Sequence, residues 1–401
     1  MTQNQPQIPP TSPSPKLWSA GFIYLLSIGI LNATSFGMTV PLIPGFAVSL
    51  GASLSFAGIA AGIFSFSALV GRPFASVIGD SFNKKHVLII FMFLNGLMTA
   101  LYAAVPDTGW LLPARIVHGL LFAVSGTVNF SLGAEFVPRE RLAEGVGFIG
   151  ISMIIGMAVG PNVGIIIMEN YSYQTAFIMS GAGIMLASLF LIRLKYENDA
   201  LPKEGGFSFG AVRLKDLFAV ELLPHVGFTA IFSLGTGLVS SYLVMLGYER
   251  SIANVGMYFI VHAIVVILTR PKIGRMTDRK GVAFAVLPGF IIASGAMILI
   301  AQATSLVPIL FAAAFFAIGA GGAFPALQTD CVRRLDASRR TLAMGTYLIG
   351  FDVGMTLGQT LGGVVSDAFG FRTAFTGAGV LMIIGFAVYW GYTRRGVKVA
   401  G

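Results

Sequence analysis

The chain has 401 residues, of which 55% are hydrophobic and only 11% are charged, and its mean hydropathy is +0.82. These values exclude a soluble globular protein and indicate an integral membrane protein. The net charge of +9 would suggest nucleic acid in a soluble protein, so the placement of the basic residues along the chain decides its meaning.

The Pro- and Ser-rich residues 1–16 are expected to form a disordered cytoplasmic tail. The apolar run that follows is long for a signal peptide and lacks a small-residue cleavage site, so we expect it to be the first membrane span. Stretches of about 20 apolar residues, long enough to cross a bilayer as helices, recur along the chain. We predict twelve spans, at residues 17–40, 53–74, 86–105, 110–133, 144–168, 175–195, 221–247, 252–270, 283–303, 306–330, 341–366 and 372–392.

The basic residues follow the positive-inside rule. With the amino terminus in the cytoplasm, 23 of the 26 Lys and Arg residues fall on the cytoplasmic side, and only Arg115, Arg250 and Arg372 fall elsewhere. This distribution predicts a multi-pass protein of the cell membrane with both termini in the cytoplasm, and it argues against a nucleic-acid partner.

No enzymatic motif is visible in the sequence. The four histidines are scattered, and GAGGAF at 319–324 lies inside an apolar span, where it cannot serve as a phosphate loop. We therefore expect no metal site, no cofactor and no enzyme activity. The single cysteine, Cys331, excludes an intrachain disulfide.

An internal repeat has an offset of 198 residues. GRPFASVIGD at 71–80 returns as TRPKIGRMTD at 269–278, and the glycines of residues 156–164 return in residues 354–362. Six spans per half keep both halves in the same orientation, so the repeat is parallel. We expect an all-α membrane protein of two pseudo-symmetric six-helix bundles, 17–195 and 221–392, joined by a cytoplasmic linker at 196–220 and followed by a tail at 393–401.

These features resemble the major facilitator superfamily of secondary transporters. Its loop motif, Gly-x-x-x-Asp-Arg-x-Gly-Arg-Arg, is imperfect around Asp80 and closer at Gly274, Asp278, Arg279 and Gly281. The stretch from Arg115 to Gly119 is similar to the family's Arg-x-x-x-Gly motif, and GMAVGPNVG at 156–164 is similar to a motif of its proton-coupled exporters. The resemblance covers nearly the whole chain and implies transport by alternating access.

The charged residues of the repeated stretch are candidates for a conformational latch between helices, with topology alone as the alternative interpretation. Arg72 and Arg270 precede prolines that we expect to end their helices, so we regard them as the mobile partners. The latch candidates are Arg72, Asp80, Lys84, Lys85, Arg270, Asp278 and Arg279.

Small residues spaced by four allow two helices to approach closely, and a proline bends a span. Such positions serve either as a hinge or for close packing alone. The candidates are Gly156, Gly160, Pro161, Gly164, Gly354 and Gly358.

Charged groups inside a span are costly in lipid and therefore point to function. Asp352, near the middle of span eleven, is the first candidate for carrying a proton, with a structural hydrogen bond as the alternative. The resemblance assigns proton coupling to Arg115, for which packing is the alternative. His262 and Glu221 are weaker candidates, and for His262 a core histidine with satisfied hydrogen bonds is the favoured alternative. Glu221 lies four residues from His225, with which it can form a coupled pair, but solvation at the membrane interface is the simpler interpretation of both.

Polar residues inside the spans are candidates for lining a substrate cavity. Asn32 occupies a region where some exporters of the family carry an acid, which shifts the proton-coupling role toward Asp352. The cavity candidates are Asn32, His118, Asn129, Asn162, Gln328 and Gln359.

The sequence favours a monomeric carrier in the lipid bilayer that exports drugs or metabolites in exchange for protons. Three alternatives stay open: export of a metallophore, proton symport or uniport uptake of a small organic anion or sugar with Arg115 as anion clamp, and a sensor without transport.

Overall fold

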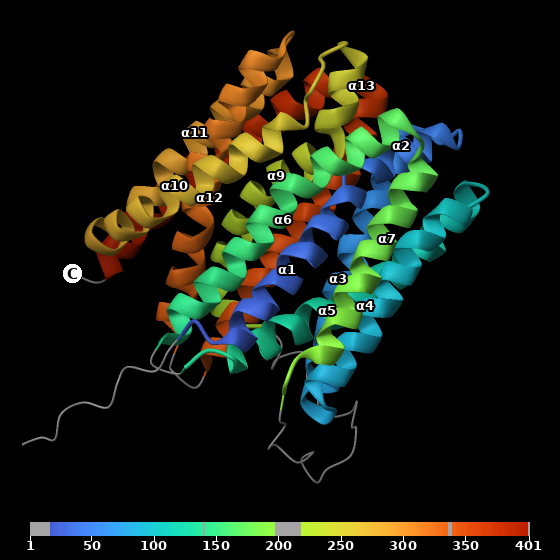
Figure 1. Ribbon diagram of the computed structural model, residues 1–401. Coiled ribbons are helices and arrows are strands. Elements are labelled where there is room, and N and C mark those ends of the chain that lie inside the picture. The colour runs from blue at the N-terminus through green and yellow to red at the C-terminus, as the bar shows by residue number, and fades with distance from the viewer. Residues whose placement is uncertain (1–16, 139–140, 197–217, 336–338, 400–401) are drawn as a thin grey trace, which may run out of the picture.

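The computed structural model describes residues 17–138, 141–196, 218–335 and 339–399, which form helices and connections without a strand in these ranges. The first half contains α1 (Ala20–Thr39), α2 (Leu42–Ser49), α3 (Leu54–Ser81), α4 (Lys84–Leu101), α5 (Thr108–Glu135), α6 (Leu142–Asn170) and α7 (Tyr173–Phe190). The second contains α9 (Leu223–Glu249), α10 (Met257–Lys280), α11 (Ala283–Gln302), α12 (Leu306–Arg334) and α13 (Arg340–Val399). Figure 1 shows the two halves as adjacent helical bundles.

In the described part of the chain, eleven helical segments are long and apolar enough to cross a membrane. The last of them, within α13, is interrupted at Gly370, whose φ of 80° and ψ of 161° are not helical. A left-handed φ suits glycine because it has no Cβ, and the break lets α13 reverse direction and supply two spans. The described residues thus provide the twelve spans of the predicted all-α fold.

Several helices begin at a polar cap that the sequence supplies. The side chains of Ser53, Asn83 and Ser172 accept hydrogen bonds from the backbone N–H groups of Phe56, His86 and Thr175. Such caps satisfy amide groups at a helix start that have no partner within the helix. They fix where α3, α4 and α7 begin.

Both bundles use the same helix pairs. In the first half α1 packs on α6, α3 on α5 and α4 on α7, while in the second half α9 packs on the first part of α13, α10 on α12 and α11 on the last part of α13. The pairs correspond one to one along the sequence, which confirms two related halves in one orientation.

The glycine repeat marks the closest of these pairs. A Cβ on Gly156 would lie 2.4 Å from the Cβ of Ala33, and one on Gly160 would lie 2.3 Å from the carbonyl oxygen of Thr34. Gly354 makes the equivalent approach to the carbonyl oxygen of Ala230, at 2.2 Å from a built Cβ. Backbones this close exclude any larger residue, so these glycines pack α6 on α1 and α13 on α9.

Two boundary predictions were wrong. The prolines at 73 and 271 do not end their helices, because α3 continues to Ser81 and α10 to Lys280. A membrane helix tolerates proline where neighbouring groups satisfy the freed backbone carbonyl. The helix of α13 also continues past residue 392, the predicted end of the last span, to Val399.

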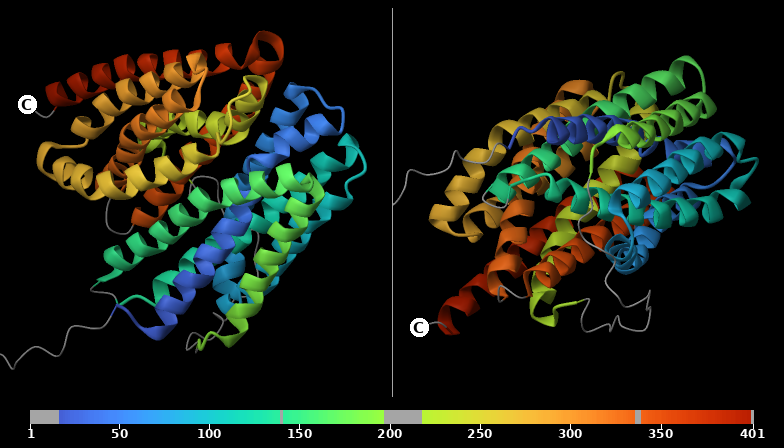
Figure 2. Two further views of the ribbon diagram at one scale, coloured as in Figure 1. Left: turned by 45° about the horizontal axis from the view of Figure 1, so that its top comes forward. Right: turned by 60° about the horizontal axis from the view of Figure 1, so that its bottom comes forward.

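The helices of the bundle end at two faces, and each face is named by the parts of the chain that lie there. The terminal face is the one at which α1 begins and α13 ends, and the opposite face carries the α2–α3 turn and the break at Gly370. In the left view of Figure 2 the two bundles meet near α2 and diverge toward the carboxy terminus. Val244 and Phe259 of the second half pack there with Leu42 and Phe46 of the first. Apolar contact between the halves therefore gathers at the opposite face.

Candidate coupling site between the two halves

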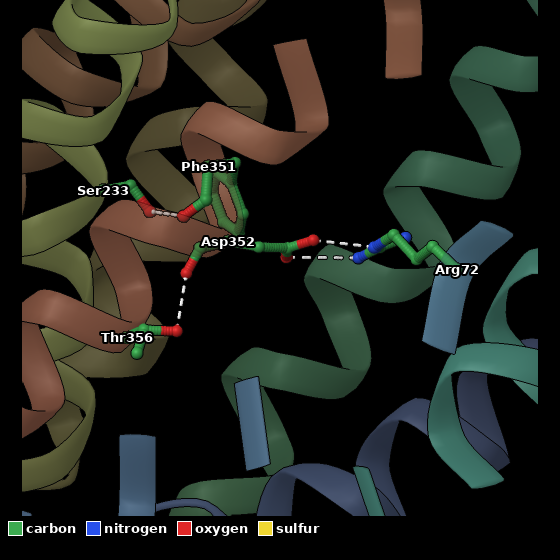
Figure 3. Close-up of polar contacts among 5 residues, drawn as sticks. All are labelled: Arg72, Ser233, Phe351, Asp352 and Thr356. Carbon is green, nitrogen blue, oxygen red and sulfur yellow. Dashed lines mark hydrogen bonds and ion pairs between the residues drawn. The ribbon is translucent and has the colours of Figure 1, made fainter. Parts of the chain in front are cut away.

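An ion pair joins the two halves of the protein. The guanidinium of Arg72 on α3 donates from Nε to Oδ2 of Asp352 on α13 at 2.6 Å and from Nη2 to Oδ1 at 3.2 Å (Figure 3). The side chain of Asp352 is 9% exposed and that of Arg72 is 31% exposed. Two parallel charged hydrogen bonds hold a guanidinium and a carboxylate in one fixed orientation, so this contact is both strong and directional.

Local hydrogen bonds position the turn of α13 that carries Asp352. The hydroxyl of Thr356 donates to the backbone carbonyl of Asp352 at 2.9 Å, and the hydroxyl of Ser233 on α9 donates to the carbonyl of Phe351 at 2.5 Å (Figure 3). Arg72 lies one residue before Pro73, inside a helix that continues for nine more residues. Both partners are thus carried on helices, and the carboxylate turn has additional support from α9.

The ion pair is the last of a series of contacts between α3 and α13. Nearest the opposite face, the hydroxyl of Ser55 donates to Asp367 at 2.6 Å, and farther along Ser65 donates to Gln359 at 3.0 Å. Between them, a Cβ on Gly58 would lie 3.0 Å from the Cα of Gly363. We name this antiparallel contact, from Ser55 to Arg72, the α3–α13 seam. It spans about 25 Å at 1.5 Å per residue, so a change at Asp352 acts on a long shared surface.

A second contact between the halves lies at the opposite face. The side-chain amide of Asn162 on α6 donates to the carbonyl of Gly256 at 2.8 Å, and the hydroxyl of Tyr248 on α9 donates to Glu169 on α6 at 2.8 Å. The repeat relates α6 and α10 to α13 and α3, but Ile154 occupies the position equivalent to Asp352. Arg270, the equivalent of Arg72, is exposed. The Arg72–Asp352 pair at the α3–α13 contact therefore has no counterpart at the repeat-related contact of α6 with α10.

Arg115 lies inside the first bundle, where it is 6% exposed. Its Nε donates to the carbonyl of Ala60 at 2.9 Å, its Nη2 donates to that of Ala61 at 3.2 Å, and its guanidinium lies 4.4 Å from the ring centre of Phe64. These contacts join α5 to α3 within one half. The charge is compensated by backbone carbonyls and an aromatic face.

His118 was predicted to line a cavity, but the structure buries it completely between α4 and α5. Its Nδ1 lies 2.8 Å from the hydroxyl of Tyr102 and its Nε2 lies 3.2 Å from that of Thr99. Both ring nitrogens thus have partners within the bundle, because a polar ring in an apolar core must be satisfied there. His118 is not at the surface between the halves.

Three other latch candidates, Lys84, Lys85 and Asp278, contact their own half. Lys84 pairs with Glu135, which also accepts a hydrogen bond from Tyr196 at 2.6 Å, and Lys85 donates to the carbonyl of Leu194 at 2.7 Å. Burial and the Glu135 carboxylate raise the pKa of Tyr196, so its hydroxyl remains a donor.

In the second half, Asp278 pairs with Arg333 at 3.0 Å, and both side chains are exposed, as is Arg279. The side chain of Asp80 lies outside the described residues. Of the latch candidates whose side chains the structure describes, Arg72 is the one that forms an ion pair across the two halves.

Glu221 and His225 do not pair with each other in the structure. His225 lies 2.7 Å from Asp330, which also accepts from Arg334 at 3.0 Å, and Glu221 instead pairs with Arg339 at 3.1 Å. A spacing of four places two side chains on one helix face, but Glu221 lies in the short 3₁₀ turn Val220–Leu222 before α9 begins. The structure thus assigns each of them a different partner.

The remaining candidates are distributed between interface and bundle. Gln359, 4% exposed, belongs to the α3–α13 seam, and Asn162 to the contact of α6 with α10. Gln328 donates to the sulfur of Met344 at 3.0 Å. The ring of His262 stacks on that of Tyr258 at 6.0 Å between centres. Asn32 on α1 and Asn129 on α5 are partly buried.

Sequence reasoning missed the small and hydroxyl residues of the seam. Gly58 and Gly62 on α3 face α13, where a Cβ on Gly62 would lie 2.1 Å from the hydroxyl of Thr360. The stretch GIAAG at 58–62 carries the small-xxx-small signal for close helix contact. That signal predicts a close contact but not which helix provides it.

Two related six-helix bundles, spans throughout and a charged pair between the halves define a multi-pass membrane transporter. The family model described as Major Facilitator Superfamily matches residues 25–338 and 226–400, and the chain belongs to this family. Its members are transporters and not enzymes.

Known proteins resemble the chain along nearly its full length. Multidrug resistance protein MdtG of Rahnella sp. is 26% identical, over 96% of this chain and 97% of the relative. The staphylopine export protein of Staphylococcus aureus is 25% identical, over 92% of this chain and 94% of its own. The crystal structure of nucleoside transporter NupG superimposes with a TM-score of 0.78 at 11% identity, covering 92% of this chain and 99% of that one. The last comparison concerns the fold alone.

Proposed function

We propose that this protein is a proton-coupled exporter of small molecules that works by alternating access, as a monomer, in the cell membrane. The single observation that carries the proposal is the Arg72–Asp352 ion pair, which links a titratable carboxylate to the interface that must open and close. Relatives named as multidrug resistance and staphylopine export proteins support the direction of transport.

The charge distribution supports a cytoplasmic terminal face. By the positive-inside rule, the face that carries Lys84, Lys85 and the Arg333–Arg334 pair is the cytoplasmic one. Apolar contacts between the halves gather at the other face, from which the α3–α13 seam extends to Arg72, and this arrangement supports a carrier closed toward the outside. Both termini then lie in the cytoplasm.

In the proposed cycle, Asp352 exchanges a proton for the guanidinium of Arg72. In the state open to the outside, a proton neutralises Asp352, so the ion pair with Arg72 cannot form while the halves close again. Release of that proton to the cytoplasm restores the carboxylate, which then pairs with Arg72 as in this structure. A substrate that arrives from the cytoplasm competes for the same carboxylate, so proton and substrate movement become coupled.

The geometry disfavours the anion-uptake alternative. An anion clamp needs a guanidinium with free donors, whereas two nitrogens of Arg115 donate to the carbonyls of Ala60 and Ala61. Export of a metallophore remains a second candidate because of the relative named staphylopine export protein.

The test uses purified protein in liposomes with an internal pH dye. Lipophilic cations, neutral drugs and amino-carboxylate chelators are added separately to wild type, Asp352→Asn and the control Glu249→Gln, which removes an exposed carboxylate. We expect substrate-evoked proton movement in wild type and in the control, and its loss in Asp352→Asn. Proton movement that survives in Asp352→Asn would overturn the coupling role, and flux in the direction of symport would overturn export.

A further inference from the structure

Arg372 is a basic residue of the opposite face for which the described part of the chain shows no ion pair with a carboxylate. Of the three basic residues placed away from the cytoplasm by the sequence, Arg115 donates to carbonyls of α3, and Arg250 donates to the carbonyls of Ala301 and Ala303 at the end of α11, at 2.9 and 2.6 Å. The contacts described for this part of the chain pair Arg372 with no carboxylate. The nearby Asp367 instead accepts from Ser55 of the other half.

A groove of about 640 Å³ begins at Arg372, in the last part of α13. Its polar end is formed by Arg372, Thr373 and Thr376, at the level of the helix break. Arg372 is exposed, so its guanidinium is accessible from outside the bundle, whereas the hydroxyl of the exposed Thr373 donates to the carbonyl of Phe369 at 2.8 Å. A guanidinium with a neighbouring hydroxyl matches the oxygens of a phosphate group.

The other end of the groove is apolar and runs along the same helix face. Its walls are Val380 and Ile384, which are 51% and 53% exposed. Gly377 forms the floor of the groove. The space above it is open, because a Cβ built on this residue meets no atom within 4 Å. From Arg372 to Ile384 the helix rises about 18 Å, close to the thickness of one leaflet of a bilayer core of about 30 Å.

We propose that this groove binds a phospholipid with a net negative headgroup, in the leaflet at the opposite face. The headgroup phosphate accepts hydrogen bonds from Arg372 and Thr376, and one acyl chain lies over Gly377 between Val380 and Ile384. Charge complementarity selects the anionic headgroup, because a zwitterionic lipid brings its own cation to the same place. The exposed apolar wall alone would accept any lipid, so Arg372 determines the preference.

Two variants separate the two ends of the groove. Arg372→Gln removes the charge, and Gly377→Leu fills the floor without a clash while it raises helix propensity. The matched controls lie on the same helix near the terminal face. They are Arg394→Gln, whose guanidinium lies over the Trp390 ring, and Gly391→Leu, where a built Cβ also meets open space.

The measurement is native mass spectrometry of the full-length protein with an equimolar mixture of phosphatidylglycerol and phosphatidylcholine of identical acyl chains. We expect wild type and both controls to retain phosphatidylglycerol about tenfold more than phosphatidylcholine, and both groove variants to lose this preference. Equal retention of the two lipids by wild type, or an unchanged preference in Arg372→Gln, would overturn the site. Loss in Arg372→Gln with full retention in Gly377→Leu would overturn the acyl-chain groove. Thermal unfolding of each variant confirms that it is folded, and the binding readout is independent of transport.

Discussion

Arg72 and Asp352 are 280 residues apart in the chain, yet their side chains form two parallel hydrogen bonds across the boundary between the two halves. One partner is a permanent cation and the other is a carboxylate that a proton can neutralise. Since the seam between α3 and α13 ends at this pair, the protonation of one residue bears directly on how the halves are held together.

The pair should show energetic coupling in a double-mutant cycle. Arg72→Gln leaves a partly buried carboxylate without its guanidinium, and Asp352→Asn leaves the guanidinium without its carboxylate. We therefore expect the double variant to lose less stability than the sum of the single variants, by about 1–3 kcal/mol. Unfolding of purified protein by heat or denaturant measures the free energies.

The exposed pair Asp278–Arg333 is the matched control for this cycle, with an expected coupling of about 0.2–1 kcal/mol. Equal coupling for the two pairs would mean that Arg72 and Asp352 act as an ordinary surface contact. Coupling for the interface pair alone supports its proposed role in holding the halves.

A methyl group at Gly58 should open the opposite face. The Cβ of Gly58→Ala would lie 2.8 Å from the carbonyl oxygen of Gln359 and 3.0 Å from the Cα of Gly363, so α3 and α13 must move apart. Overpacking of this kind costs about 1–3 kcal/mol, which shifts the equilibrium toward the open state about fivefold or more. The readout is the labelling rate of Val244→Cys, a buried position between the halves, by an impermeant maleimide.

Replacing the buried Cys331 by Ser removes background labelling. Gly126→Ala is the control, because a Cβ on Gly126 meets open space. The maleimide labelling rate of Val244→Cys is compared between the protein with Gly58 and the Gly58→Ala variant. Equal rates in the two proteins would mean that the α3–α13 seam does not control closure of the opposite face.

Only the glycines of α13 that face α9 should be important for the stability of the fold. A Cβ on Gly358 would lie 2.0 Å from the carbonyl oxygen of Leu234, whereas one on Gly345 in the same helix meets no atom within 4 Å. Gly358→Ala should lower the free energy of unfolding by about 1–3 kcal/mol, and Gly345→Ala should leave it unchanged or raise it. Thermal unfolding of the purified variants checks both, and equal effects would contradict close packing of α13 on α9.

The sequence was sufficient for the fold but not for the contacts of its charged residues. Composition and the 198-residue offset predict the spans and the two halves, because lipid restricts a spanning segment to few conformations. The same restriction makes Asp352 conspicuous. Its partner could not be predicted, because the rotation of each helix about its axis depends on packing that one sequence does not encode locally.

Pro73 illustrates how a local rule obscured that partner. Read as a helix end, it placed Arg72 at the membrane edge, next to the charges of the following loop. In the structure α3 passes through Pro73, so Arg72 lies inside a span and reaches α13. His118 illustrates the opposite error. As a polar residue in a span it was expected to line a cavity, but its ring nitrogens lie within hydrogen-bond distance of Thr99 and Tyr102 in its own bundle.

Arg115 provides a test that separates packing from proton coupling. Its planar guanidinium donates to two successive carbonyls, those of Ala60 and Ala61, and Lys has the charge without this fork. Arg115→Lys should therefore destabilise the protein by about 1–3 kcal/mol, as expected for a buried charged group that loses hydrogen bonds. The number of protons moved per substrate in liposomes should stay the same in the protein that remains folded. A changed proton-to-substrate ratio at normal stability would instead place Arg115 in the coupling reaction, and the carboxylate of Asp352 would then act together with it rather than with Arg72 alone.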